Sequence, residues 1–170
     1  MSSTFVIDNF VIANDLQLHY RRWKTPEHNH KLPPVLLLHG LASSSYIWNM
    51  VALRLAEQGY DVIALDQRGH GESSKIDHDY DFATILADDL AVIELLALQR
   101  PLVVGHSWGA MVALELAANS GIELSGLVLV DGALTQLSQS PGWSREKALV
   151  ELAPPRYAGV RRETFLSFYE

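Results

Sequence analysis

The sequence predicts an α/β protein with a mostly parallel sheet, and three observations lead to this class. Four short, continuous apolar runs occupy residues 35–38, 62–65, 102–104 and 127–130. Longer segments with apolar residues at helical spacing separate these runs, whereas the first part of the chain alternates apolar and polar residues. Strands that are apolar on both faces and alternate with helices are typical of a parallel sheet covered on both sides.

The alternating pattern near the N-terminus predicts an antiparallel hairpin. Residues 5–13 and 16–23 alternate apolar and polar side chains, and Asn14-Asp15 between them favours a tight turn. A polar loop, residues 24–31, leads from this hairpin to the first apolar run. The two hairpin strands and the four apolar runs together predict a sheet of six strands.

Three amphipathic segments predict the helices that cover the sheet. They span residues 46–58, 82–99 and 108–119. Gly59 and Gly121 follow the first and the third segment, where a glycine commonly ends a helix because it tolerates a left-handed backbone.

The pattern changes near residue 133, so we expect a core of residues 1–133 and a second part of residues 134–170. A turn-rich linker occupies residues 133–142, and Ser144 has the character of an N-cap for a helix that extends to residue 152. A further amphipathic helix is predicted from residue 161 to the last residue. Because the sequence stops within that helix, we expect it to be part of a longer protein.

Composition excludes several classes of function. The chain has 170 residues, 13 Lys and Arg against 20 Asp and Glu, a formal net charge of −7 and no Cys. An acidic chain without a basic stripe is not expected to bind nucleic acid, and a chain without Cys has no disulfide or thiolate site. No signal peptide and no membrane-spanning stretch are visible, so we expect a cytoplasmic protein that contacts no membrane. His28 and His30 lack a third ligand at metal-binding spacing, and we expect no metal or cofactor.

The pentad Gly105-His106-Ser107-Trp108-Gly109 fits the G-x-S-x-G pattern. It directly follows an apolar run and directly precedes a predicted helix, which is the strand–turn–helix setting that this motif requires. A serine at such a turn sits in strained backbone, and glycines beside it allow the strand and the helix to approach closely. Its hydroxyl is then presented at a helix N-terminus, which favours a developing negative charge.

A second motif, His39-Gly40-Leu41, follows the apolar run of residues 35–38. On its own it is a plain strand-to-helix turn. Together with the turn at Ser107, it favours a loop in which the backbone N–H of Leu41 and that of Trp108 hold an oxyanion.

A third motif, Asp66-Gln67-Arg68-Gly69-His70-Gly71-Glu72-Ser73, follows the run of residues 62–65. Its two glycines could be mistaken for a dinucleotide-binding loop. The third glycine of that fingerprint is replaced by Ser74, and no helix is predicted to start there. We therefore expect a structural turn that ties the sheet to the rim of the active site.

With these three motifs in this order, the sequence resembles the α/β-hydrolase family, in its esterase, haloperoxidase-like and C–C-bond hydrolase branch. The resemblance covers residues 5–133. It implies an eight-stranded, mostly parallel sheet, Ser107 as the nucleophile, and Leu41 and Trp108 as oxyanion donors. Dehalogenases and epoxide hydrolases of this family carry Asp where this chain has Ser107, so the resemblance implies hydrolysis of a small ester, lactone or related carbonyl compound instead.

The resemblance also implies that residues 134–170 begin a helical cap, or lid, over the active site. The candidate pocket-lining residues in this part are Trp143, Leu149, Tyr157, Phe165 and Phe168. Ordinary helix packing accounts for the same apolar residues equally well.

The sequence departs from the family where the catalytic acid and base are expected. In the family the base is a His that follows the nucleophile along the chain. All seven His of this chain precede Ser107: His19, His28, His30, His39, His70, His78 and His106. We do not expect His39 or His106 to act as the base, because the first lies in the oxyanion loop and the second diverges from Ser107 at the turn. Asp131 is a candidate acid, although a turn before Gly132 explains it better.

Two consequences follow from a fold truncated after the sixth strand. Residues 127–130 become an exposed apolar edge, which predicts self-association or pairing with a missing C-terminal segment. The chain as given would also lack an activated nucleophile. A non-catalytic, degenerate hydrolase fold that binds a small hydrophobic ligand or a partner chain is therefore the competing hypothesis.

Overall fold

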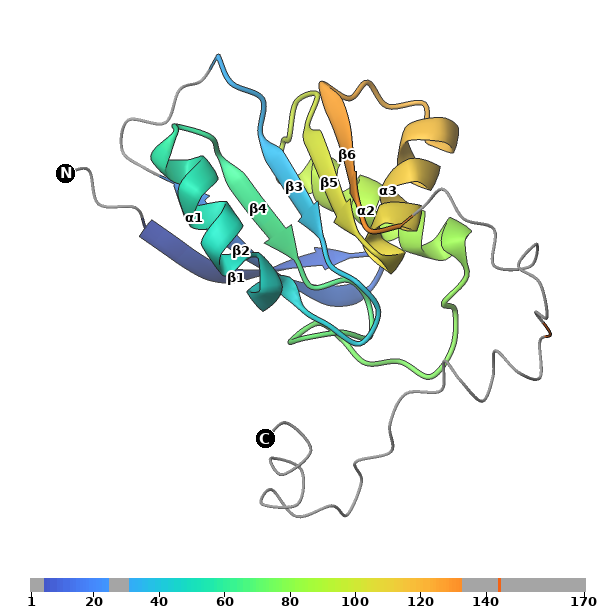
Figure 1. The fold of residues 1–170 in the computed structure, drawn as a ribbon. Coiled ribbons are helices and arrows are strands. Elements are labelled where there is room, and N and C mark those ends of the chain that lie inside the picture. The colour runs from blue at the N-terminus through green and yellow to red at the C-terminus, as the bar shows by residue number, and fades with distance from the viewer. Residues whose placement is uncertain (1–4, 25–30, 133–143, 145–170) are drawn as a thin grey trace. The chain divides into compact units, whose positions relative to one another are not determined.

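The computed structural model describes residues 5–24, 31–132 and Ser144, nearly all of them in one compact unit of residues 1–135. Six strands form a single sheet in the order β1-β2-β4-β3-β5-β6 (Figure 1). The strands are β1 (Phe5–Ala13), β2 (Leu16–Lys24), β3 (Val35–Leu38), β4 (Val62–Leu65), β5 (Leu102–His106) and β6 (Gly126–Val130). The last four run parallel to their neighbours among themselves, while β2 pairs antiparallel with both β1 and β4. The predicted α/β class and six strands are confirmed.

Alternate residues of the parallel strands face two separate hydrophobic clusters. Leu36 and Leu38 of β3 pack with helices α2 (Phe82–Leu95) and α3 (Trp108–Asn119). Val35 and Leu37 pack with helix α1 (Asn49–Glu57) on the other face (Figure 1). All four side chains are fully buried, which explains the continuous apolar run in the sequence.

The N-terminal hairpin has the register that the sequence predicts. Ala13 faces Leu16, and the two turn residues Asn14 and Asp15 have φ angles of 50° and 61°. Two consecutive left-handed residues are characteristic of a type I′ turn, whose twist matches that of the strands, and Asn and Asp tolerate this conformation.

Two helix boundaries differ from the prediction. The segment expected to form one helix from residue 46 begins with a 3₁₀ turn, η1 (Ser45–Trp48), and α1 starts only at Asn49. The second helix ends at Leu95 and not at residue 99, because Ala97 adopts a left-handed conformation with φ of 53°. The Ala97 and Leu98 N–H groups then donate to the carbonyls of Glu94 and Ile93, which makes a Schellman end without a glycine.

Strand β6 lies at one edge of the sheet (Figure 1). It pairs with β5 on one side and with no strand of the described ranges on the other. Val128 and Val130 are 42% and 40% exposed. The predicted apolar edge is therefore present in the part of the chain that the structure describes.

The linker and helices predicted after residue 133, including every candidate pocket residue of the lid, lie outside the described residues, apart from Ser144. His28 and His30 lie outside them as well. Within the described ranges, no helix has the length and apolar character to cross a membrane, and no three His, Asp or Glu side chains are grouped to hold a metal ion.

Candidate functional site

Ser107 occupies the sharp turn between β5 and α3. Its φ of 53° and ψ of −115° lie in a region of backbone conformation that residues other than Gly rarely adopt. Such strain costs about 1–3 kcal/mol. Two backbone hydrogen bonds hold the turn. The Ser107 N–H donates to the Val130 carbonyl at 2.8 Å, and the Ser107 carbonyl accepts from the Ala110 N–H at 3.0 Å. The neighbouring strand β6 and the first turn of α3 thus impose this conformation.

The two outer glycines of the pentad are required by close backbone contacts. A Cβ atom on Gly105 would lie 2.2 Å from the Gly109 carbonyl oxygen. A Cβ atom on Gly109 would lie 2.4 Å from the Leu38 carbonyl oxygen and 2.5 Å from that of His39. Both distances are far below a van der Waals contact, so α3 can begin this close to β5 and β3 only with glycine at these positions.

The His39-Gly40-Leu41 loop lies beside Ser107. A Cβ atom built on Gly40 would be 3.3 Å from the Ser107 Cβ, so the two backbones are in close contact. Leu41 is 60% exposed at the rim of this loop. The backbone N–H groups of Leu41 and Trp108 donate no hydrogen bond to another residue of the described ranges, and for Trp108 this is usual because it is the first residue of a helix.

His39 is fully buried, and both of its ring nitrogens are occupied. Nδ1 lies 2.8 Å from the Gly40 carbonyl oxygen, to which it donates, and Nε2 accepts from the Gln67 N–H at 3.1 Å. Burial lowers the pKa of His39 to about 4. His39 is therefore a neutral, fixed part of the loop with no nitrogen available to accept a proton from Ser107.

His106 is partly buried, and its Nδ1 atom has no hydrogen-bond partner among the described residues. This nitrogen would be 3.0 Å from a Cβ atom on Gly40, so it faces the oxyanion loop. Ser107 Oγ neither accepts nor donates a hydrogen bond within the described part of the chain. No histidine of that part is thus engaged with the Ser107 hydroxyl.

The loop after β4 is organised by the buried carboxylate of Asp66. It accepts hydrogen bonds from the Ser45 N–H at 2.5 Å, the Glu72 N–H at 2.9 Å and the His19 ring at 2.8 Å. Burial raises the pKa of Asp66, but these hydrogen bonds outweigh it and the pKa is lowered overall. Gly71 passes so close that any Cβ would collide with the carboxylate. This agrees with the predicted structural turn.

The same loop reaches the site through contacts that the sequence does not reveal. Arg68 forms a buried, two-pronged ion pair with Asp88 of α2, at 2.5 Å and 2.9 Å. The His70 ring lies between two others, 5.0 Å from the His39 ring and stacked at 5.5 Å on the Trp108 ring. These contacts join segments that are 20 to 40 residues apart, and no local sequence signal marks them.

Asp131 follows β6 and is exposed, with a φ of 50°. That conformation fits the turn-forming interpretation of this residue. The next residue, Gly132, lies directly against Ser107, because its Cβ would be 2.5 Å from the Ser107 carbonyl oxygen. Asp131 is therefore close in space to the turn at Ser107, but its carboxylate has no hydrogen-bond partner among the described residues.

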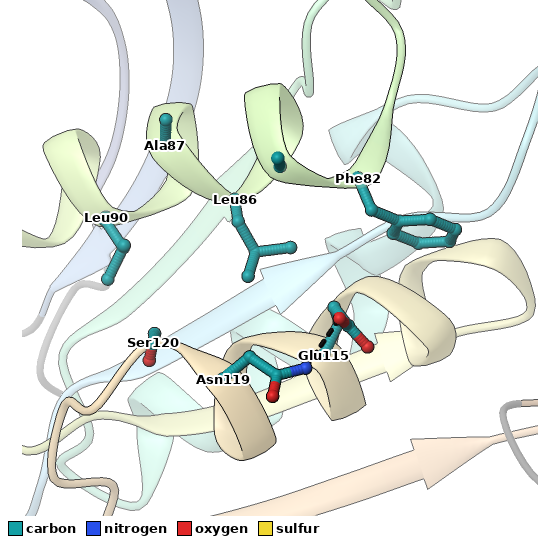
Figure 2. A pocket seen from close by; sticks show the side chains of 8 residues that line it. Phe82, Leu86, Ala87, Leu90, Glu115, Asn119 and Ser120 are labelled. Atoms are coloured by element: carbon teal, nitrogen blue, oxygen red, sulfur yellow. Dashed lines mark hydrogen bonds between the residues drawn. The ribbon is translucent and has the colours of Figure 1, made fainter.

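A separate pocket of about 360 Å³ lies between α2 and the C-terminal half of α3 (Figure 2). Figure 2 shows Phe82 and Leu86 of α2 facing Glu115 and Asn119 of α3. At ~1.5 Å per helical residue, Glu115 is about 12 Å along α3 from Ser107. This pocket is therefore distinct from the turn at Ser107.

The sequence model of the α/β hydrolase fold family matches residues 33–166, which include all three motifs. The chain belongs to the α/β-hydrolase fold family. It is 41% identical to epoxide hydrolase B of Mycobacterium tuberculosis over 87 residues, 50% of this chain and 24% of the relative. It is 38% identical to N-formylmaleamate deformylase of Pseudomonas putida over 130 residues, 76% of this chain and 46% of the relative.

Among solved structures, this hydrolase-fold chain is similar to the thioesterase domain from the curacin biosynthetic pathway. The TM-score is 0.69 and the identity 34%, and the match covers 87% of this chain and 52% of that one. The chain spans between a quarter and about half the length of these three proteins. The two relatives from Mycobacterium tuberculosis and Pseudomonas putida are enzymes by name, an epoxide hydrolase and a deformylase.

Proposed function

We propose that this chain carries the nucleophile and the oxyanion hole of a serine hydrolase that acts on a small ester, lactone or related carbonyl substrate. The observation that carries the proposal is Ser107 on its strained turn in contact with Gly40, together with the backbone N–H groups of Leu41 and Trp108 that the described residues leave unpaired. The serine stands where the family's epoxide-hydrolase and dehalogenase branches carry Asp, which favours acyl chemistry. No metal or cofactor enters the proposed reaction, and a cytoplasmic location stays a prediction.

In the proposed reaction, Ser107 Oγ attacks the carbonyl carbon and gives its proton to a base. The carbonyl oxygen becomes an oxyanion, held by the N–H groups of Leu41 and Trp108, and the leaving group departs with a proton. Water then hydrolyses the acyl-serine. A serine hydroxyl is a weak nucleophile without a base, and His39 cannot serve because both its nitrogens are bonded. His106 does not bond to Ser107 Oγ either, so the base is proposed to come from outside the described residues.

The test is hydrolysis of a nitrophenyl ester by the protein and by two serine variants. Ser107→Ala is expected to reduce hydrolysis to the uncatalysed background. Ser125→Ala removes an exposed hydroxyl that forms no hydrogen bond in the described structure, and it is expected to retain the parental rate. Equal hydrolysis by the parent and Ser107→Ala would contradict the proposal.

The alternative function is a non-catalytic member of the family that binds a small hydrophobic ligand or a partner chain. One observation favours it: within the described residues, no base contacts Ser107 Oγ. Such a binder would retain its ligand affinity in Ser107→Ala, and neither the parent nor the variant would hydrolyse the ester.

A further inference from the structure

We propose that His70 is a positioning residue that clamps the two segments of the oxyanion hole together. The inference rests on the proposed function, because the placement of these backbone amides matters for chemistry only if they hold an oxyanion. The juxtaposition that carries it is one imidazole ring in contact with the rings of both His39 and Trp108.

Each of the two rings belongs to a segment that carries one proposed donor. Trp108 supplies its own backbone N–H, and its indole stacks on His70 with an interplanar angle of 27°. His39 is two residues before Leu41, and its ring meets His70 at 57°. Since His39 is itself held by the Gly40 carbonyl, a contact on its ring acts directly on the oxyanion loop.

His70 can act as a clamp because its own position is fixed. Its Nδ1 lies 2.9 Å from the Arg68 carbonyl oxygen, and its backbone N–H donates to the Gln67 carbonyl at 3.0 Å. Arg68 is anchored to α2 through the buried pair with Asp88. These hydrogen bonds and the buried ion pair therefore hold the His70 ring in a fixed position relative to the core.

Gln67 provides a second link from the same loop to the oxyanion segment. Its backbone N–H donates to His39 Nε2 at 3.1 Å, and its side-chain amide donates to the His39 carbonyl at 3.0 Å. These bonds hold His39 but do not reach Trp108. The two segments touch directly where Gly40 meets Ser107 and where Gly109 meets His39, and the His70 ring adds a side-chain contact to each of them.

Three substitutions distinguish the contribution of the His70 ring from that of its Nδ1 hydrogen bond. His70→Ala removes both, His70→Phe keeps an aromatic ring without the bond to Arg68, and His70→Asn keeps a donor without the ring. His78→Ala is the matched control, because it removes an exposed histidine of the same loop region whose ion-pair partners among the described residues are Asp77 and Asp79. Circular dichroism establishes that each variant is folded.

The first readout is amide hydrogen exchange, which needs no catalytic activity. The Ser107 N–H and the Gln67 N–H are followed, since they donate to Val130 and His39. We expect exchange about 3- to 10-fold faster in His70→Ala and His70→Asn, the range that loss of an aromatic pair produces. His70→Phe and His78→Ala are expected to match the parent.

The second readout is the rate at which a fluorophosphonate labels Ser107. We expect labelling about tenfold slower in His70→Ala and His70→Asn, less than the ~100-fold cost of a full 1 Å misplacement, and near the parental rate in His70→Phe. Amide exchange at the parental rate in all variants would overturn the clamp. The same conclusion would follow if the exchange and labelling rates of His70→Phe changed as much as those of His70→Ala. An unlabelled parent with the expected exchange pattern would instead favour the non-catalytic alternative and leave the clamp standing.

Discussion

Ser107 shows at the scale of one residue how a site is held in a costly conformation. Its left-handed φ is imposed by hydrogen bonds to β6 and α3, and by glycines that allow these elements to come within contact. Strain of this kind persists only where the surrounding structure over-determines it, and it is concentrated at functional sites.

This strain predicts that Ser107→Gly is more stable than the parent. Glycine adopts the observed φ without steric cost, so we expect the free energy of unfolding to rise by about 1 kcal/mol after the added entropy of the unfolded chain is subtracted. Urea denaturation measures this, with Ser125→Gly as a control that should be neutral or slightly destabilising. A less stable Ser107→Gly would mean that the turn is not strained.

Asp89 is a second residue that destabilises the fold, because it is 1% exposed and its Oδ2 atom has no hydrogen-bond partner among the described residues. Burial, and then the charge of Asp88, raise the pKa of Asp89 well above its ordinary value. At a pH between the unfolded and the folded pKa, the folded protein therefore keeps a proton on Asp89 that the unfolded chain has lost. Stability should fall as the pH rises from the unfolded pKa, about 4, toward the folded pKa.

Asp89→Asn removes this titration while it keeps the shape of the protonated carboxyl. We expect the variant to gain stability relative to the parent at pH 8 and to differ little at pH 4, with a gain within the ~0.5–3 kcal/mol of single substitutions. Thermal unfolding at the two pH values measures it. Glu94→Gln on the exposed side of the same helix is the control, and an equal effect of Asp89→Asn at both pH values would contradict the prediction.

At the scale of elements, the sequence predicts best where a local signal coincides with burial. Helix α3 begins and ends as predicted, because the turn at Ser107 precedes it and Gly121 follows it. The end of α2 was predicted four residues too late, since Ala97 carries no sign of its left-handed backbone. The turn at Ser107 was predictable from its glycines, whereas the His70–Trp108 stack depends on distant segments meeting.

Ala97 therefore offers a direct test of the Schellman end of α2. We expect Ala97→Gly to stabilise the protein by about 0.5–1 kcal/mol, because glycine avoids the steric cost of the left-handed conformation. Ala87→Gly in the exposed middle of α2 should destabilise by about 1 kcal/mol, since glycine is disfavoured there. Chemical denaturation of both variants measures the difference, and the same sign for both would refute the assigned helix end.

At the scale of the whole molecule, the edge strand β6 is the feature that predicts self-association. One side of its backbone pairs with no described strand, and its Val128 and Val130 are exposed; these are the features by which an edge strand pairs with another chain. We propose a second copy of this chain as the partner, because two β6 strands related by a two-fold axis pair antiparallel.

Val128→Lys is expected to shift this association toward monomer, since a charged residue on an edge strand opposes pairing. Sedimentation velocity over a concentration series measures the change. Gln58→Lys adds the same charge at an exposed site beyond α1 and should leave the association unchanged. A parent that is monomeric at every concentration would exclude self-association through β6.

The most direct test of the site is a crystal structure of the protein with a phenylboronic acid. We expect a tetrahedral boron bonded to Ser107 Oγ, with one boron oxygen within hydrogen-bond distance of the Leu41 and Trp108 backbone nitrogens. Boron attached to another residue, or an adduct whose oxygens point away from both amides, would contradict the assignment of nucleophile and oxyanion hole.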